Sequence, residues 1–167
     1  MRIGNLLLAL VVVCICTGAA FADPNTPAEE KPWTYDFGEI RSTYPEAEPN
    51  NTCPGQIVLC GDVVDPAQIN TAGDVDWFRL ENVAGGTIIT VGTDASPSGD
   101  PDAGDTNLEL YYNCVTPRVA YDDDSGPGFY SLMTYTVPAG SPGNYDIKVR
   151  HYSSGGTGYY KMSIACT

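Results

Sequence analysis

Hydrophobic and polar positions alternate in short runs along most of this chain. The alternation is cleanest in Tyr145–Arg150 and again in Tyr159–Ile164. A period of two is typical of a β-strand that buries one face and exposes the other to water. Other short runs are rich in β-branched and aromatic residues and are bounded by Gly, Pro, Asn and Asp. The predicted strands are Ile57–Val64, Trp77–Leu80, Thr87–Thr93, Leu108–Tyr112, Arg118–Tyr121, Tyr130–Val137, Tyr145–His151 and Tyr159–Ala165.

This spacing, a strand about every ten residues, predicts an all-β fold of about eight strands. An antiparallel β-sandwich or jelly roll is the architecture that such a pattern favours. No stretch has the period of a long helix. The Gly- and Ser-rich segment Ser153–Gly158 predicts that the last two strands form a hairpin.

The first residues read as a signal for export. Residues 1–22 begin with a basic Arg2, continue with the apolar run Leu6–Cys16 and end with Ala20–Phe21–Ala22. This order is typical of a secretory signal peptide with an A-x-A cleavage site. The alternative is a membrane anchor, but the apolar run is shorter than the roughly 18 residues needed to span. We therefore expect a secreted protein, periplasmic or extracellular, with no membrane insertion after cleavage.

A segment of different composition follows the predicted signal peptide. Residues 23–45 carry four prolines and mixed charge, which predicts an N-terminal extension or linker before a domain at 46–167. Within the extension, Trp33, Tyr35 and Phe37 alternate and could form a short edge strand or a docking segment.

Four cysteines remain after removal of the signal peptide: Cys53, Cys60, Cys114 and Cys166. In an exported domain they predict two disulfides in one of three connectivities. We favour Cys53–Cys60, which would bracket a turn, and Cys114–Cys166, which would tie the last strand to an inner one. Zinc is disfavoured because no pair has C-x-x-C spacing.

Composition excludes some functions. The chain has 8 Lys and Arg against 21 Asp and Glu, for a formal charge of −13. So few basic residues, scattered along the sequence, disfavour nucleic acid as a partner and also disfavour an anionic membrane surface. His151 is the single histidine and lacks a nucleophile motif, so triad catalysis is not expected. A small hydrolase that uses a pair of carboxylates remains an alternative.

Two groups of acidic residues suggest a metal site. In an extended segment, Glu46, Glu48 and Asn50 project to the same side, and Asp74 and Asp76 do so at the start of a strand. Oxygen-only ligands suit Ca²⁺. The alternative is that both groups form turns.

Other polar and aromatic clusters have simpler interpretations. Asp100–Asp105 lacks the Gly and Glu of an EF-hand loop, and Asp122–Asp124 is expected to be a solvated loop, with a secondary calcium contact as the alternative. Each of the pairs Tyr111–Tyr112 and Tyr159–Tyr160 places one ring away from the core, where it either supports the sheet or forms a ligand platform.

Six segments, in order, resemble the bacterial pre-peptidase C-terminal domain family, which includes the collagen-binding domains of clostridial collagenases. They are Glu48–Thr52, Gly73–Leu80, Ala84–Ile88, Asn107–Tyr111, Tyr135–Gly140 with Gly143–Val149, and Gly158–Ile164.

The resemblance implies a non-catalytic β-sandwich that accompanies secreted peptidases and binds calcium. The ligands it implies are Glu46, Glu48, Asn50, Asn51, Asp74 and Asp76. Family members often have Asp at the position of Asn51, so the amide lowers the ligand charge here.

We therefore expect a calcium-binding module that adheres to an extracellular protein or polysaccharide, with a separately encoded peptidase as a further partner. The alternatives are the carboxylate-pair hydrolase and a purely structural envelope protein.

Overall fold

In the computed structural model of the chain, residues 37–167 are described, and they form an all-β unit without helices. The signal peptide and most of the predicted extension lie outside this range. Of the three alternating aromatic residues near the N-terminus, Phe37 lies within it. Its ring packs over Gly92, where a Cβ would come within 2.6 Å of the ring. No helix within residues 37–167 is long and apolar enough to cross a membrane.

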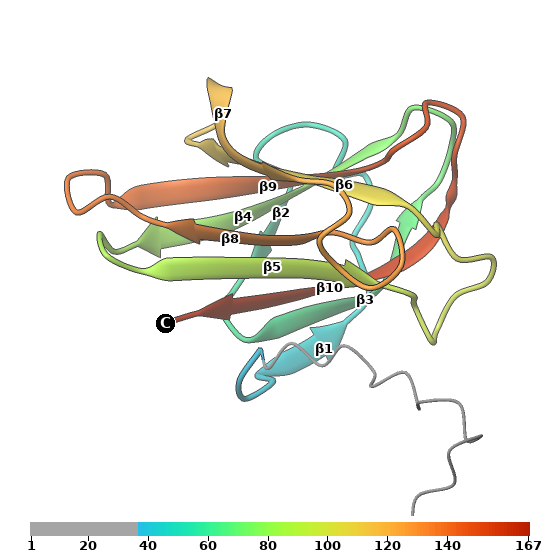
Figure 1. Cartoon of the computed structure of the whole chain (residues 1–167), viewed down its shortest axis with the longest axis horizontal. Helices are drawn as coiled ribbons and strands as arrows, with labels where there is room; N and C mark the ends of the chain where they lie inside the picture. The colour runs from blue at the N-terminus through green and yellow to red at the C-terminus, as the bar shows by residue number, and fades with distance from the viewer. Residues whose placement is uncertain (1–36) are drawn as a thin grey trace, which may run out of the picture. The chain divides into compact units, whose positions relative to one another are not determined.

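Two five-stranded sheets make up the fold (Figure 1). Sheet A has the order β1–β3–β10–β5–β8, and sheet B has the order β2–β4–β9–β6–β7. All neighbours are antiparallel except the edge pairs β1–β3 and β2–β4, which are parallel. The strands are β1 (Ser42–Tyr44), β2 (Gln56–Val58), β3 (Asp62–Ile69), β4 (Val75–Val83), β5 (Ile88–Asp94), β6 (Thr106–Tyr112), β7 (Val115–Asp122), β8 (Leu132–Thr136), β9 (Gly143–His151) and β10 (Gly158–Cys166).

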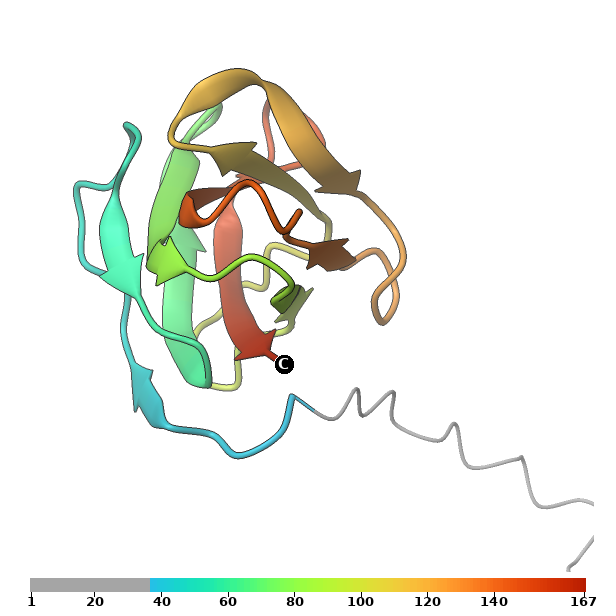
Figure 2. The ribbon, with the colours of Figure 1, turned by 90° about the vertical axis from the view of Figure 1, so that its left-hand side faces the viewer.

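The core lies between the two sheets, which face each other (Figure 2). Sheet B contributes Phe78, Ile147 and Leu110, which are neighbours across β4, β9 and β6. Sheet A contributes Val64, Met162 and Val91 from its three central strands. Because side chains alternate along a strand, the residues between these positions lie on the outer faces.

The predicted β-sandwich is confirmed, with ten strands in place of eight. The run Ile57–Val64 is two strands in different sheets, because a turn at Leu59–Asp62 interrupts it. There the Asp62 carboxylate accepts a 2.8 Å hydrogen bond from the Leu59 amide, and Gly61 takes a positive φ of 90°. β1 is the other added strand and comes from the segment predicted as an extension.

The predicted hairpin between the last two strands is wrong. β9 pairs with β4 and β6 in sheet B, whereas β10 pairs with β3 and β5 in sheet A. The segment 152–157 therefore crosses from one sheet to the other. Both strands alternate because each buries one face, and they bury it against each other's sheet.

The two expected disulfides are present, but the predicted pairing is wrong. The bonds join Cys53 to Cys114, with Cα atoms 5.9 Å apart, and Cys60 to Cys166, with Cα atoms 5.3 Å apart. Cys53 and Cys60 flank the extended strand β2, which holds them apart. Cys114 lies at the β6–β7 turn of sheet B and Cys166 ends β10 in sheet A, so they belong to different layers.

Candidate metal centre and binding face

The segment that follows β1 lies across the beginning of β4. The Glu46 amide donates to the Pro66 carbonyl in β3 at 2.9 Å, and the Trp77 amide donates to the Asn50 carbonyl at 3.0 Å. The backbone of residues 46–50 is thereby fixed between the two sheets. This places Glu46, Glu48 and Asn50 beside Asp76, the second residue of β4.

Carboxylate oxygens of Glu46, Glu48 and Asp76 lie within 4.8 Å of one another. Asn50 joins this group, because its amide Nδ2 lies 2.5 Å from Glu46 Oε1 and its backbone amide donates to Glu48 Oε2 at 2.9 Å. Four of the six residues named from the sequence therefore converge.

Two buried oxygens in this group have no hydrogen-bond partner among residues 37–167. Asp76 is fully buried, and its Oδ2 accepts from the Tyr160 hydroxyl at 2.7 Å while its Oδ1 has no donor. Asn50 is 2% exposed, and its Oδ1 also has no donor. Buried polar atoms are normally satisfied, so two unpartnered oxygens beside the carboxylates of Glu46 and Glu48 fit a site built to hold a cation.

The electrostatics of the cluster agree with that fit. Burial, followed by the charge of Glu46, raises the pKa of Asp76 to about 9. Burial also raises the pKa of Glu46 to about 7 and outweighs the lowering effect of its hydrogen bonds to Gln68 and Asn50; the charges of Glu48 and Asp74 add smaller upward contributions. Without a cation, burial and the neighbouring carboxylates therefore favour the protonated forms of Glu46 and Asp76, and a bound cation would favour the ionised forms.

Asp74 and Asn51 lie beside the cluster and have other contacts. The Asn51 amide is 2.5 Å from Asp74 Oδ1, and Asp74 Oδ2 accepts from the Asn70 backbone amide at 2.7 Å. The side chain of Asn70 also donates to Glu48. Asn70 thus connects Asp74 to the cluster. Its role is not predictable from the sequence pattern, because it stands alone just after β3.

The outer face of sheet B carries a concentration of basic and aromatic side chains. We call this set the cationic face: Trp77, Arg79, Glu109, Tyr111, Arg118, Tyr121, Asp146, Lys148 and Arg150. Its four cations are half of the chain's 8 Lys and Arg. They gather because the strand order β4–β9–β6–β7 places Trp77 opposite Lys148, Lys148 opposite Glu109, and Glu109 opposite Tyr121.

Glu109 lies at the centre of the cationic face with three cations around it. Arg150, Arg118 and Lys148 approach its carboxylate at 3.4, 3.5 and 3.9 Å. Because one carboxylate cannot neutralise three cations, the surroundings of Glu109 keep a positive charge. Arg118 also lies over the Tyr121 ring at 4.0 Å from its centroid.

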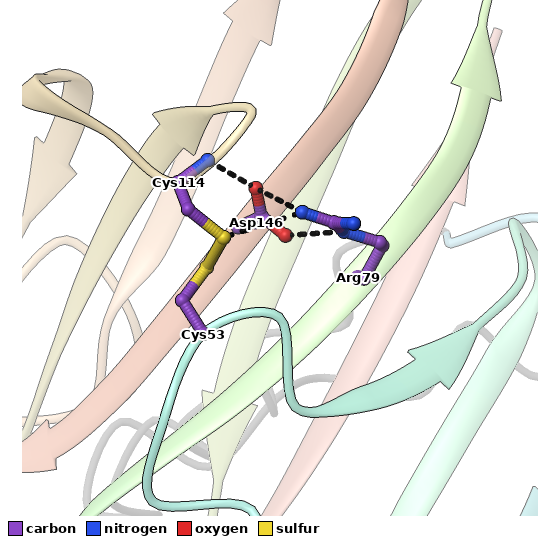
Figure 3. Close-up of a disulfide and its surroundings, with 4 residues drawn as sticks. All are labelled: Cys53, Arg79, Cys114 and Asp146. Carbon is purple, nitrogen blue, oxygen red and sulfur yellow. Dashed lines mark hydrogen bonds and ion pairs between the residues drawn. A yellow bond between two sulfur atoms is a disulfide. The ribbon is translucent and has the colours of Figure 1, made fainter.

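A buried ion pair anchors one side of this face (Figure 3). Arg79 Nε donates to Asp146 Oδ1 at 2.7 Å, and the side chain of Asp146 is fully buried. Asp146 Oδ2 accepts from the Cys114 amide at 2.7 Å and from Arg79 Nη2 at 3.2 Å. The ion pair therefore joins β4 and β9 to the turn that the Cys53–Cys114 disulfide fixes.

The two ring nitrogens of His151 contact backbone atoms. Its Nδ1 accepts from the Ser153 amide at 3.0 Å, and its Nε2 faces the Ala103 carbonyl at 2.9 Å. Both ring nitrogens are therefore engaged by the backbone, which fits a role in holding the β9–β10 connection.

The fold defines an all-β protein of the two-sheet sandwich class. More particularly, it is similar to the pre-peptidase C-terminal domain of a collagenase from Bacillus anthracis, with a TM-score of 0.50 and 15% identity over 65% of this chain and 92% of that one. The fold is therefore similar to that of a pre-peptidase C-terminal domain, in line with the sequence resemblance, and at this identity the likeness concerns the fold alone.

Two periplasmic inhibitors of g-type lysozyme also match. That of Aeromonas hydrophila has a TM-score of 0.45 and 18% identity, with 67% of this chain and 98% of that one covered. That of Salmonella Typhimurium has a TM-score of 0.44 and 15% identity, with 78% and 100% covered. No family model matches the chain, and no curated protein sequence matches it.

Proposed function

We propose that this protein is an exported, non-catalytic module that binds calcium and uses the cationic face to bind an acidic extracellular polysaccharide. Export is supported by the two disulfides, which form and persist in oxidising compartments. The observation that carries the calcium assignment is the pair of buried, unpartnered oxygens on Asp76 and Asn50 beside the carboxylates of Glu46 and Glu48.

Calcium fits this donor set better than a transition metal. All donors are carboxylate or amide oxygens, and neither thiol nor imidazole is among them, which favours a hard cation. A bound Ca²⁺ would supply the positive charge that the cluster lacks. It would hold residues 46–50 against β4, because Glu46, Glu48 and Asn50 come from that segment and Asp76 from the strand.

Thermal unfolding with and without calcium tests this assignment. Ligand binding to the native state adds about 2.7 kcal/mol when the ligand is at 100 times its Kd. For a domain of this size that corresponds to a rise of roughly 5–11 °C in Tm. We expect this rise for the mature protein on adding CaCl2 after chelation. Glu48→Gln should reduce this rise in Tm, because it replaces a proposed calcium ligand with a neutral amide. Glu48 is exposed, so the change does not open the core.

Glu39→Gln is the matched control, because it removes the same charge from an exposed residue outside the cluster. It should respond to calcium as the wild type does. The assignment would be wrong if calcium left the Tm of the wild type unchanged and native mass spectrometry found no bound metal.

The cationic face is the surface best suited to an acidic polymer. In a protein with a formal charge of −13, it gathers Arg118, Lys148 and Arg150 around a single carboxylate. Trp77 and Tyr111 lie beside them, with ring centroids 5.2 Å apart. An acidic polysaccharide offers anionic groups for the cations and apolar sugar faces for the rings, so it matches both features.

Binding to polygalacturonate, with a neutral glucan for comparison, tests the choice of ligand. The wild type should retain polygalacturonate at low salt and release it as salt increases. Lys148→Gln/Arg150→Gln should weaken retention roughly tenfold, since an exposed ion pair contributes up to about 1 kcal/mol.

Lys161→Gln is the control, because Lys161 pairs with Asp94 on sheet A. Equal binding by all variants would refute the role of the face. Retention of polyglutamate but not of polygalacturonate would indicate an acidic protein as the partner. Release of sugar fragments would support the alternative of a carboxylate-pair hydrolase.

A further inference from the structure

A second acidic group lies on the other side of β9 from the proposed calcium centre. It consists of Asp105, just before β6, and of Asp123 and Asp124 in the β7–β8 loop. The two groups are separate, because β9 runs between β4 and β6. Asp76 contacts Tyr160 inside the sandwich, whereas the second group lies toward the outer face, around Asn107.

Carboxylate oxygens of Asp105, Asp123 and Asp124 lie within 4.8 Å of one another. None of the ion pairs formed between residues 37–167 includes any of the three. Burial and the charges of Asp124 and Asp123 raise the pKa of Asp105, and the nearby His151 acts in the opposite direction. Three carboxylates therefore face one another without a paired cation from this part of the chain.

Asn107 gives independent evidence for a ligand. It is fully buried, and its Oδ1 has no hydrogen-bond partner in the described part of the chain. Its amide faces the cluster, because Nδ2 donates to Asp123 and also lies 3.2 Å from the Tyr121 hydroxyl. With a cation held by these carboxylates, a half-turn of this amide would direct its oxygen at the cation. Asp105 Oδ1 is likewise buried without a partner.

The loop that carries two of the carboxylates is held in place. Ser131 Oγ lies 2.5 Å from the Thr106 carbonyl and 2.6 Å from the Asp123 carbonyl, between the loop and β6. The Asp122 carboxylate accepts from the Leu132 amide at 2.8 Å. Asp122 is thus engaged within the loop, and Asp123 and Asp124 remain as the side chains directed at Asp105.

We infer that Asp105, Asn107, Asp123 and Asp124 form a second calcium site. Three carboxylates and one amide oxygen are the donor types that Ca²⁺ takes in proteins, with water completing its coordination. Because Asp124 is exposed, the site is open to solvent on one side. His151 is not a ligand, since its nitrogens contact the backbone of Ala103 and Ser153. This site uses none of the residues of the first centre, so either site can be present without the other.

Native mass spectrometry and calcium titration of the mature protein test this inference. We expect two Ca²⁺ per chain for the wild type. Asp123→Asn/Asp124→Asn should retain one. Asp100→Asn/Asp102→Asn is the matched control, because it removes two charges from exposed residues outside the cluster and should retain both ions.

A milder variant covers the case in which the double variant does not fold. Asp124→Asn alters only an exposed carboxylate, and it should raise the Kd of one ion about tenfold while the other ion is unaffected. Circular dichroism at each calcium concentration confirms that the variants compared are folded.

The outcomes separate the two sites. A single ion that is lost in Glu48→Gln and kept in Asp123→Asn/Asp124→Asn would overturn the second site and leave the first. A single ion with the reverse behaviour would support the second site and overturn the first. No bound calcium at millimolar concentration would overturn both.

Discussion

The two disulfides should stabilise the fold by similar and large amounts. They close loops with sequence separations of 61 and 106 residues. On the loop-entropy model, closure of such loops contributes ~4.3 and ~4.8 kcal/mol at 25 °C. The pairing predicted from sequence would instead contribute ~2.5 kcal/mol for the short Cys53–Cys60 loop. The observed pairing therefore predicts a larger loss of stability on removal of the disulfide of Cys53 than the pairing predicted from the sequence does.

The assay is urea unfolding of the wild type and of two double variants, Cys53→Ser/Cys114→Ser and Cys60→Ser/Cys166→Ser. Each variant should lose about 4–5 kcal/mol, and the two losses should agree within about 1 kcal/mol because the entropy depends only on the logarithm of loop length. Each removes one bond and leaves no free thiol. The m value should rise slightly, because the unfolded chain becomes less constrained.

Two results would refute this reasoning. One is a loss below about 1 kcal/mol for either double variant, since the loop closure would then contribute little. The other is peptide mapping of the oxidised protein that links Cys53 to Cys60. Calcium should be present at equal concentration throughout, so that ligand binding does not differ among the samples.

Three further predictions concern the buried charges. Asp146→Asn should lower the free energy of unfolding in urea by about 2–4 kcal/mol, because Arg79 loses its buried partner. Tyr160→Phe should cost about 1–2 kcal/mol in the calcium-free protein, because Asp76 loses a hydrogen-bond donor. In calcium-free protein, thermal stability should fall as pH rises from about 4 to about 7 for Glu46 and to about 9 for Asp76, because the fold raises both pKa values and so holds protons that the unfolded chain releases. A stability that rose over this pH range would contradict the assigned burial.

The sequence predicted where most strands lie but not how they are distributed between sheets. Alternation in Tyr145–Arg150 and Tyr159–Ile164 correctly indicated two half-buried strands. The alternation does not distinguish two neighbouring strands of one sheet from two strands in facing sheets. The connecting segment appeared suited to a hairpin because Gly and Ser fit both a tight turn and a longer crossing.

The convergence of the candidate metal ligands could be predicted in part from the local sequence pattern. Glu46, Glu48 and Asn50 converge because alternate residues of an extended segment point the same way. Their proximity to Asp76 depends on the sheet topology, which pattern alone did not give. Asn70 was missed because a lone Asn before a turn is usually a turn former, and only the fold brings it beside Glu48.

Net charge proved a poor guide to the charge of any one surface. The four cations of this face are far apart in the sequence: Arg79, Arg118, Lys148 and Arg150. In a chain with 21 acidic residues, so few cations do not predict a surface that binds an anion. The strand order β4–β9–β6–β7 makes their strands neighbours, and a period of two places Arg79, Lys148 and Arg150 on the outer face. Arg118 reaches the same face beside an irregularity in the β6–β7 pairing, where it contacts Glu109 and Tyr121. Many of the acids lie in loops and in the first cluster, away from the cationic face. The second cluster adjoins this face, because the Asn107 amide contacts both Asp123 and Tyr121. An acidic protein can therefore present a local anion-binding surface. Calcium at either cluster would reduce the negative charge around the sandwich and so favour an acidic ligand.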